Sequence, residues 1–265
     1  MAEAKNEYNF PDLPAESSQC AADFLTSLYS DAQFLDFLTN SAVVGDWAAH
    51  TLEGALEGVY NKALKPYDLA KANPGARTRF LRQRRQILFE MFLGRLVDNF
   101  QVYLVDLIRA VLRREPRMLQ LQQPSISLEE ALRYRTTDEL IHRVIERKIA
   151  DLSYQGFERL QEWCASRGIV LVTSEAEKGE VIELIGTRNL IAHNRCLIDE
   201  QYCTRVGIGV EKIGQPRMLE SSDFLKAQAL LLRIVLATDV AAVLKFRLIK
   251  VPVLLAAVDP LTEHA

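Results

Sequence analysis

One eight-residue stretch carries most of the side chains in this chain that could do chemistry. It runs from Arg188 to Arg195 and holds two arginines, two asparagines and one histidine. A histidine can move protons near neutral pH, and an arginine can hold a phosphate through paired hydrogen bonds. The stretch closes an apolar run at 181–187, which predicts a helix over about 175–193 with these polar side chains at its end.

Helix geometry decides which of these side chains can meet. Asn189 and His193 are four residues apart and share a face of the helix. Arg188 and His193 are five residues apart, which places them about 140° apart around the helix axis. One helix therefore does not direct both toward a small ligand unless the long arginine side chain swings across. We expect a second copy of the helix, related by a two-fold axis, to supply the missing group.

The stretch resembles the Arg-x4–6-His signature of the HEPN superfamily, small helical nucleotide-binding domains of which many are metal-independent endoribonucleases. The flanks are similar as well: the family often continues with Asn, a turn and an acid, which here are Asn194 and Asp199. Residues 209–213 resemble a Gly-x-Lys-Ile-like stretch before a last apolar helix, and residues 100–103 resemble a Phe-Glu-x-Tyr core. Gln101 stands where the family has an acid, and Cys196 stands where glycine is common. The resemblance covers roughly residues 80–250.

The resemblance implies a nuclease that cuts RNA without a metal or other cofactor. The ribose 2′-OH would lose a proton to His193 and attack the adjacent phosphorus, while Arg188 would hold the phosphate. The implied partners are RNA, a second copy that completes a composite site in a homodimer, and an antitoxin or regulatory partner of a toxin or anti-phage effector. The candidate catalytic residues are Arg188, Asn189, His193 and Asn194, and the candidate substrate-binding residues are Arg195, Gln101, Arg84 and Arg85.

Each of these residues also has a structural interpretation. Arg188 and His193 could satisfy the last carbonyls of the helix, with Asn194 in the left-handed cap position. Arg84 and Arg85 belong to a basic cluster over 77–85 that could be a solvated face. Two alternatives to a nuclease therefore stay open: a non-catalytic HEPN module that binds nucleotides or RNA, and a helical scaffold or partner protein with no nucleic-acid role.

Length and composition are those of an ordinary globular protein. The chain has 265 residues, of which 49% are hydrophobic and 25% charged, so it can bury a core without staples. A net charge of −3 means that any RNA contact must come from local patches. The four cysteines are scattered and form no Cys-x2-Cys pair, which favours a reducing cytosol and disfavours a metal site. We expect a cytoplasmic protein, because no apolar signal core is present and charges interrupt the apolar tail.

The apolar spacing predicts an all-α fold, a bundle of five or more helices with a small extended arm or hairpin before the last helix. We expect helices over about 24–38 and 42–64, with Asp31 as a break, and a long central helix over 78–114. The glycine-rich stretch 202–221 predicts the arm, and the last helix is expected over 222–250. A Pro-Gly punctuation near residue 75 suggests an N-terminal helical region over 1–75, with a flexible lead-in over 1–16, and a HEPN-like domain over 76–265.

Overall fold

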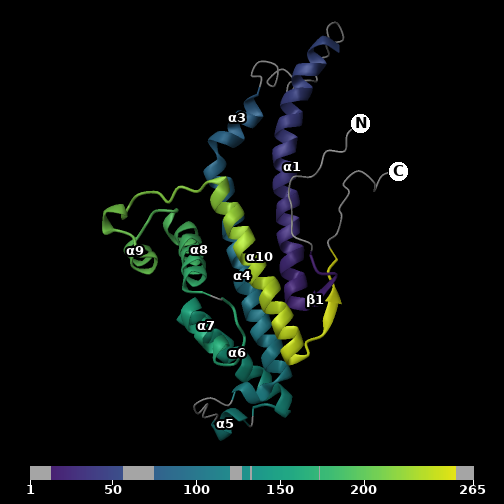
Figure 1. Cartoon of the computed structure of the whole chain (residues 1–265), viewed down its shortest axis with the longest axis vertical. Helices are drawn as coiled ribbons and strands as arrows, with labels where there is room; N and C mark the ends of the chain where they lie inside the picture. The colour runs from purple at the N-terminus through teal and green to yellow at the C-terminus, as the bar shows by residue number, and fades with distance from the viewer. Residues whose placement is uncertain (1–12, 56–74, 120–126, 132, 173, 255–265) are drawn as a thin grey trace. The chain divides into compact units, whose positions relative to one another are not determined.

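The computed structural model describes residues 13–55, 75–119, 127–131, 133–172 and 174–254 (Figure 1). Nearly all regular structure in these ranges is helical, and one short antiparallel strand pair is the only sheet within them. The predicted all-α fold with five or more helices is therefore confirmed. Among the described helices we find none with an apolar stretch of the length that a bilayer crossing requires.

The helix bounds follow the predicted order along the chain. The helices are α1 (Gln19–Ala55), α3 (Ala76–Gln83), α4 (Arg85–Arg114), α5 (Leu128–Ala131), α6 (Thr137–Gln155), α7 (Phe157–Ala165), α8 (Glu175–Asn194), α9 (Glu200–Val206) and α10 (Ser221–Phe246). Short 3-10 turns cover Pro116–Leu119 and Val210–Lys212, and the strands are β1 (Glu16–Ser18) and β2 (Lys250–Pro252). Helix α8 and the helix predicted over 175–193 differ by one residue at the C-terminal end.

Three elements differ from their predictions. The first two predicted helices form one helix, α1, as far as Ala55, because the chain stays helical through residues 39–41. Asp31, a possible break or cap in the sequence, lies inside this helix, and its carboxylate accepts from Arg95 Nε at 2.9 Å. The predicted central helix is interrupted at Arg84, whose backbone angles (φ −107°, ψ 13°) separate α3 from α4. The predicted arm begins as a helix, α9, and becomes extended only beyond it, where Pro216 forms an isolated bridge with Leu197.

The chain divides into two compact units. The first unit comprises residues 1–26, 102–171 and 233–265, and the second comprises 27–101 and 172–232. The predicted boundary near residue 75 borders the stretch 56–74, which lies outside the described residues, so that boundary stays a prediction. Most of the predicted lead-in also lies outside the described residues, although β1 begins at Glu16.

The first unit is built around the C-terminal half of α4. Tyr103, Leu107 and Val111 recur on steps of four and are almost completely buried, which is the pattern of a helix face inside a core. Helix α6 contributes buried Ile145, Ile149 and Leu152 to the unit, and α7 contributes Leu160, Trp163 and Cys164. The positive φ of 87° at Gly156 lets the chain turn between α6 and α7, which pack on each other.

A buried carboxylate fixes the start of α1 in this unit. Asp239 of α10 is 3% exposed; its Oδ2 accepts from the Ser18 N–H at 3.1 Å, and its Oδ1 accepts from the Ser18 hydroxyl. The Ser18 hydroxyl in turn accepts from the Ala21 N–H at 3.3 Å, as an N-cap residue does. Ser18 also pairs with Lys250 in the strand ladder. The Asp239 carboxylate thus accepts both hydrogen bonds from Ser18, and the Ser18 hydroxyl in turn caps the first turn of α1.

We expect Asp239→Ala to lower the free energy of unfolding by about 2–4 kcal/mol, because two buried donors of Ser18 lose their acceptor and each orphan costs about 1–3 kcal/mol. Urea denaturation of the full chain measures the change. Asp36→Ala is the matched control, since Asp36 is an exposed carboxylate on α1, and it should change stability by less than about 0.5 kcal/mol. An Asp239→Ala protein as stable as the unsubstituted chain would contradict this role.

Candidate functional site

Helix α8 presents the predicted motif at its C-terminal end, and both of its ends are capped. The Ser174 hydroxyl accepts from the Glu177 N–H at 3.1 Å, and two acids lie in the first turn, as suits a helix N-terminus. At the other end, the Cys196 N–H donates to the Leu190 carbonyl at 2.9 Å while Arg195 takes a left-handed conformation with φ 51°. This is a Schellman-type ending. The left-handed residue is therefore Arg195, whereas the capping interpretation had placed Asn194 in that position.

Arg188 is held against α4 by an ion pair. Its Nε donates to Asp98 Oδ1 at 2.6 Å, and its Nη1 donates to Asn189 Oδ1 at 3.2 Å. The Arg188 side chain is 27% exposed and that of Asp98 is 48% exposed, so the pair lies at the surface. These bonds go to side chains and not to the carbonyls at the end of the helix. The guanidinium is thus oriented, and its remaining N–H donors are open to a further acceptor.

The other polar residues of the motif have different surroundings. His193 is exposed and forms no hydrogen bond or ion pair with the described part of the chain. Asn194 is half-buried, and its Nδ2 donates to the Leu197 carbonyl at 2.7 Å, which stabilises the turn after the helix. Arg195 is exposed. The Arg188 side chain contacts α4, whereas His193 faces solvent. This agrees with helix geometry, in which a spacing of five residues separates two side chains by about 140° around the axis.

Helices α4 and α8 run antiparallel where they carry these residues. Asp98 contacts Arg188, while Gln86, earlier on α4, lies with Nε2 3.9 Å from the Cys196 sulfur, later along the chain than α8. The start of α4, which begins at the exposed Arg85 and directly follows the exposed Arg84, therefore lies beside the end of α8. The structure brings these two predicted substrate-binding arginines to the same end of the second unit as His193.

Gln101 does not contact the motif in the described residues. Its side chain is half-buried and forms no hydrogen bond there, so its predicted role in substrate binding stays a prediction. Asp98, three residues earlier on α4, is the residue that reaches α8. Sequence reasoning missed Asp98, because nothing in the local pattern of α4 indicates a partner 90 residues away.

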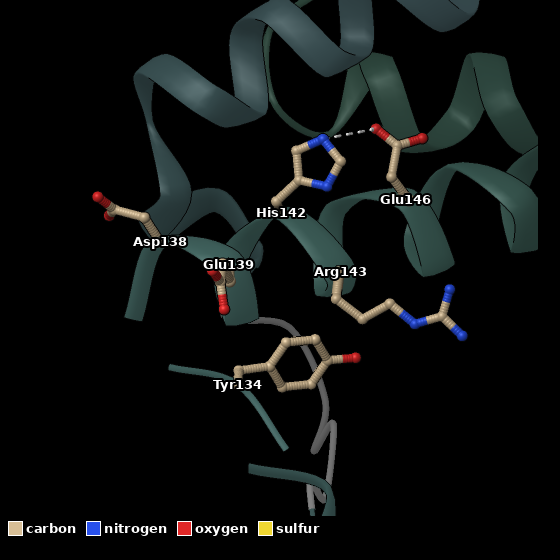
Figure 2. Close-up of a pocket in the computed structure, with 6 residues that line it drawn as sticks. All are labelled: Tyr134, Asp138, Glu139, His142, Arg143 and Glu146. Carbon is tan, nitrogen blue, oxygen red and sulfur yellow. Dashed lines mark ion pairs between the residues drawn. The ribbon is translucent and has the colours of Figure 1, made fainter. Parts of the chain in front are cut away.

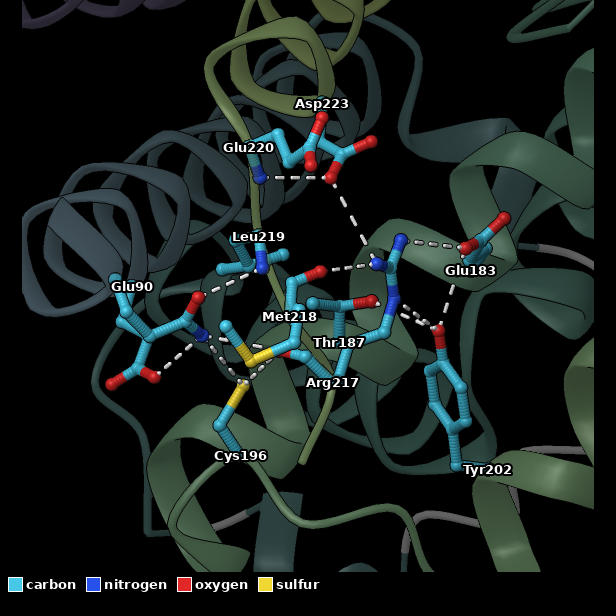
Figure 3. Close-up of polar contacts among 11 residues, drawn as sticks. Glu90, Glu183, Thr187, Cys196, Tyr202, Arg217, Met218, Leu219, Glu220 and Asp223 are labelled. Atoms are coloured by element: carbon cyan, nitrogen blue, oxygen red, sulfur yellow. Dashed lines mark hydrogen bonds and ion pairs between the residues drawn. The ribbon is translucent and has the colours of Figure 1, made fainter. Parts of the chain in front are cut away.

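A polar network anchors the connection that follows α8 (Figure 3). The side-chain amide of Gln86 donates to the Arg217 carbonyl at 3.1 Å and accepts from the Leu219 N–H at 2.8 Å. The Arg217 guanidinium donates to Glu183 Oε1 at 3.2 Å and to the Tyr202 hydroxyl at 3.3 Å. The segment before α10 is thereby tied to α4 through its backbone and to α8 through its side chain. No local sequence pattern indicates Gln86 or Arg217 as organising residues.

Apolar packing completes this support. Leu190, Ile198, Tyr202 and Cys203 form a buried cluster between α8 and α9. Gly186 allows the close approach, because a Cβ there would lie 3.0 Å from Tyr202 Cδ2. Burial, helped by the charge of Glu90, raises the pKa of the Cys196 thiol to about 11, so the thiol is protonated at neutral pH. Cys196 is therefore a packed core residue and not a nucleophile.

A second group of titratable side chains lies on the first unit. Six residues line an open pocket of about 660 Å³ there: Tyr134, Asp138, Glu139, His142, Arg143 and Glu146 (Figure 2). Two arginines of α4 contact the Glu146 carboxylate and the His142 imidazole of this pocket. Arg109 donates to Glu146 through Nε at 2.7 Å and Nη2 at 2.9 Å, and Arg113 Nη2 lies 2.9 Å from His142 Nε2. His142 and Glu146 of this pocket are therefore both engaged by arginines, whereas His193 on α8 has no such contact with the described residues, and the motif on α8 is the stronger candidate.

The Arg109–Glu146 pair makes stability depend on pH. Hydrogen bonds from Arg109 hold the pKa of Glu146 below its ordinary value. A lowered carboxyl pKa stabilises the fold above the unfolded value, about 4, and the contribution is lost as the pH falls through the folded pKa. We expect Glu146→Gln to lower the free energy of unfolding by about 1 kcal/mol at neutral pH. The difference from the unsubstituted chain should shrink toward pH ~3.

Urea denaturation at several pH values measures that difference. Glu115→Gln is the matched control, because Glu115 is an exposed acid near the end of α4 with no side-chain partner in the described ranges. If the difference in free energy of unfolding between Glu146→Gln and the unsubstituted chain were the same at neutral and at acidic pH, that result would contradict the assigned ion pair.

No family model, curated protein or solved structure matches this chain. Within the described ranges, no three His, Cys, Asp or Glu side chains are grouped so as to hold a metal ion. The HEPN resemblance therefore rests on the residues of the motif and its flanks, and the geometry at the end of α8 is what a functional proposal must explain.

Proposed function

We propose that this chain is a metal-independent endoribonuclease of the HEPN kind. The observation that carries the proposal is the contrast between two motif residues near the C-terminal end of α8: His193 is exposed and forms no hydrogen bond or ion pair with the described residues, and Arg188 is pre-oriented but still partly accessible. An exposed imidazole is accessible to a ligand, and an oriented guanidinium with unused N–H donors can receive a phosphate. A role as a toxin or anti-phage effector, with an antitoxin or regulatory partner, follows only by analogy with the family.

The proposed reaction uses the ribose as nucleophile. His193 removes the proton of the 2′-OH, the 2′-oxygen bonds to phosphorus, and the bond from phosphorus to the 5′-oxygen breaks. The products are a 2′,3′-cyclic phosphate and a 5′-hydroxyl, whose oxygen takes up a proton from an imidazolium or water. Arg188 donates to the phosphate oxygens as negative charge develops on them. Acid–base help is worth about 10²–10⁴-fold and a placed donor about 10²–10³-fold, which is adequate for a slow nuclease.

A second copy of the chain supplies the complete site in this proposal. Arg188 is directed toward α4, and His193 lies about 140° away around α8, so the two groups of one copy do not converge. A two-fold axis beside the end of α8 would place Arg188 of one copy opposite His193 of the other. Arg195, Arg84 and Arg85 are exposed and could contact the RNA backbone on either side.

One observation favours a second candidate function, that of a helical scaffold. The Arg188–Asp98 ion pair links α8 to α4, and Asn194 stabilises the turn after the helix, so two motif residues have structural uses. In that case the motif would stabilise the fold and bind no RNA. A third possibility is a non-catalytic module that binds RNA. Assays of RNA binding and RNA cleavage on the same protein distinguish it from the nuclease and from the scaffold.

We expect the purified chain to cleave single-stranded RNA in EDTA, to leave DNA of the same sequence intact and to form 2′,3′-cyclic phosphate ends. His193→Ala should lower the cleavage rate at least 100-fold, because the reaction loses its acid–base group. His142→Ala is the matched control, since His142 is also exposed but lies on α6, and it should cleave normally. Gel analysis of end-labelled RNA measures the rate, and mass spectrometry identifies the product ends.

Two results would decide against the nuclease. RNA binding without cleavage would indicate a binding module. Absence of both, together with an equal loss of about 1 kcal/mol in Arg188→Ala and Asp98→Ala, would indicate the scaffold, because either substitution then removes only the ion pair.

The shared site predicts recovery of activity in mixed dimers. Arg188→Ala and His193→Ala proteins should each be inactive alone. A mixed dimer retains one intact arginine and one intact histidine across the axis, so random mixing should restore about a quarter of the unsubstituted activity. Native mass spectrometry verifies that mixed dimers form. Continued inactivity in verified mixed dimers would reject the shared site. The nuclease proposal would still hold if the unsubstituted chain cleaves RNA.

A further inference from the structure

A pocket of about 500 Å³ in the first unit gathers arginines from two segments of the chain. Arg109, Arg113 and Arg114 of α4 line one side, and Arg247, just after α10, lines another. The start of α1, from Ser18 to Asp23, contributes a further wall. The volume is in the range of small-ligand sites, about 300–1,000 Å³. All of these residues belong to one compact unit.

The free charge in this pocket is positive. Its two acids already have partners: Asp106 pairs with Arg109, and Asp23 accepts from Gln19 Nε2 at 2.8 Å. Arg109 is further occupied by Glu146, and Arg113 contacts His142. Arg114 and Arg247 form no side-chain hydrogen bond or ion pair with described residues. Two forked guanidinium groups are therefore available, and that geometry matches a phosphate group.

Backbone hydrogen bonds position the segment that carries Arg247. Arg247 has φ 53°, a left-handed conformation that glycine adopts with less strain. The segment that follows it enters β2, whose ladder pairs Ser18 with Lys250, and the Val253 N–H donates to the Ala15 carbonyl at 3.0 Å. The walls formed by α1 and by residues 247–249 are thus joined by backbone hydrogen bonds.

The rest of the lining is apolar. Ala110 of α4 and Leu248 and Ile249 next to Arg247 line the pocket, and Ile249 is 84% exposed. Exposed aliphatic side chains beside paired cations suit a ligand that joins a phosphate to a flat apolar group. We infer that this pocket binds a small organic phosphate of the nucleotide class, with its phosphate on Arg114 and Arg247 and its apolar part on Leu248 and Ile249. This inference does not depend on the proposed nuclease function.

Calorimetric titration of the full chain with adenosine 5′-monophosphate, in the absence of RNA, tests the inference. We expect one molecule bound per chain, with inorganic phosphate at least tenfold weaker and adenosine without phosphate showing no binding. Arg114→Gln should weaken binding at least tenfold. Arg135→Ala and Arg143→Ala, which remove exposed arginines elsewhere on the same unit, are the matched controls and should bind normally.

Arg247→Gly separates binding from folding. Glycine fits the left-handed backbone at this position, so the variant should melt at the same temperature as the unsubstituted chain or higher. Its affinity for the nucleotide should nevertheless fall at least tenfold. Absence of nucleotide binding, unchanged affinity in Arg247→Gly, or binding of RNA oligonucleotides alone would each overturn the inference.

Discussion

The ion pair between Arg188 and Asp98 connects the candidate chemistry to the fold. It fixes the guanidinium at the surface between α8 and α4, where a carboxylate already neutralises part of its charge. An exposed pair of this kind is worth only about 1 kcal/mol or less, and a phosphate can form charge-assisted bonds of comparable strength. The pair can therefore orient Arg188 in the free protein and still yield to, or share the guanidinium with, an incoming phosphate.

Rigid support at the end of α8 comes from contacts that are distant in sequence. The Gln86 amide holds the backbone of the segment before α10, and Arg217 extends from that segment back to α8. Tyr202 fills the space that Gly186 leaves and adds buried area between α8 and α9. The exposed end of the helix thus stands on a packed and hydrogen-bonded base, which is the arrangement that a precise binding geometry requires.

Local sequence patterns predicted much of the secondary structure, but they did not predict which residues distant in the sequence contact each other. The helix over α8 follows from the apolar run at 181–187, which lies within the helix itself. The helical fold class follows from the same periodicity. The pairing of Arg188 with Asp98, the uninterrupted α1 at Asp31 and the ladder between β1 and β2 depend on residues far apart in the chain. No periodic pattern encodes such contacts, because each joins segments that are far apart along the chain.

The turn after α8 also bears on how this chain can change over evolution. Cys196 has φ 59°, a conformation in which glycine would be less strained by about 1 kcal/mol, yet its sulfur is buried against the Arg217 carbonyl at 3.3 Å. Exchange for glycine would relax the backbone and remove a buried thiol, whose packing is worth a similar amount, about 1 kcal/mol. Opposing contributions of equal size make the exchange nearly neutral. The turn after α8 can therefore be built with either residue at little difference in stability.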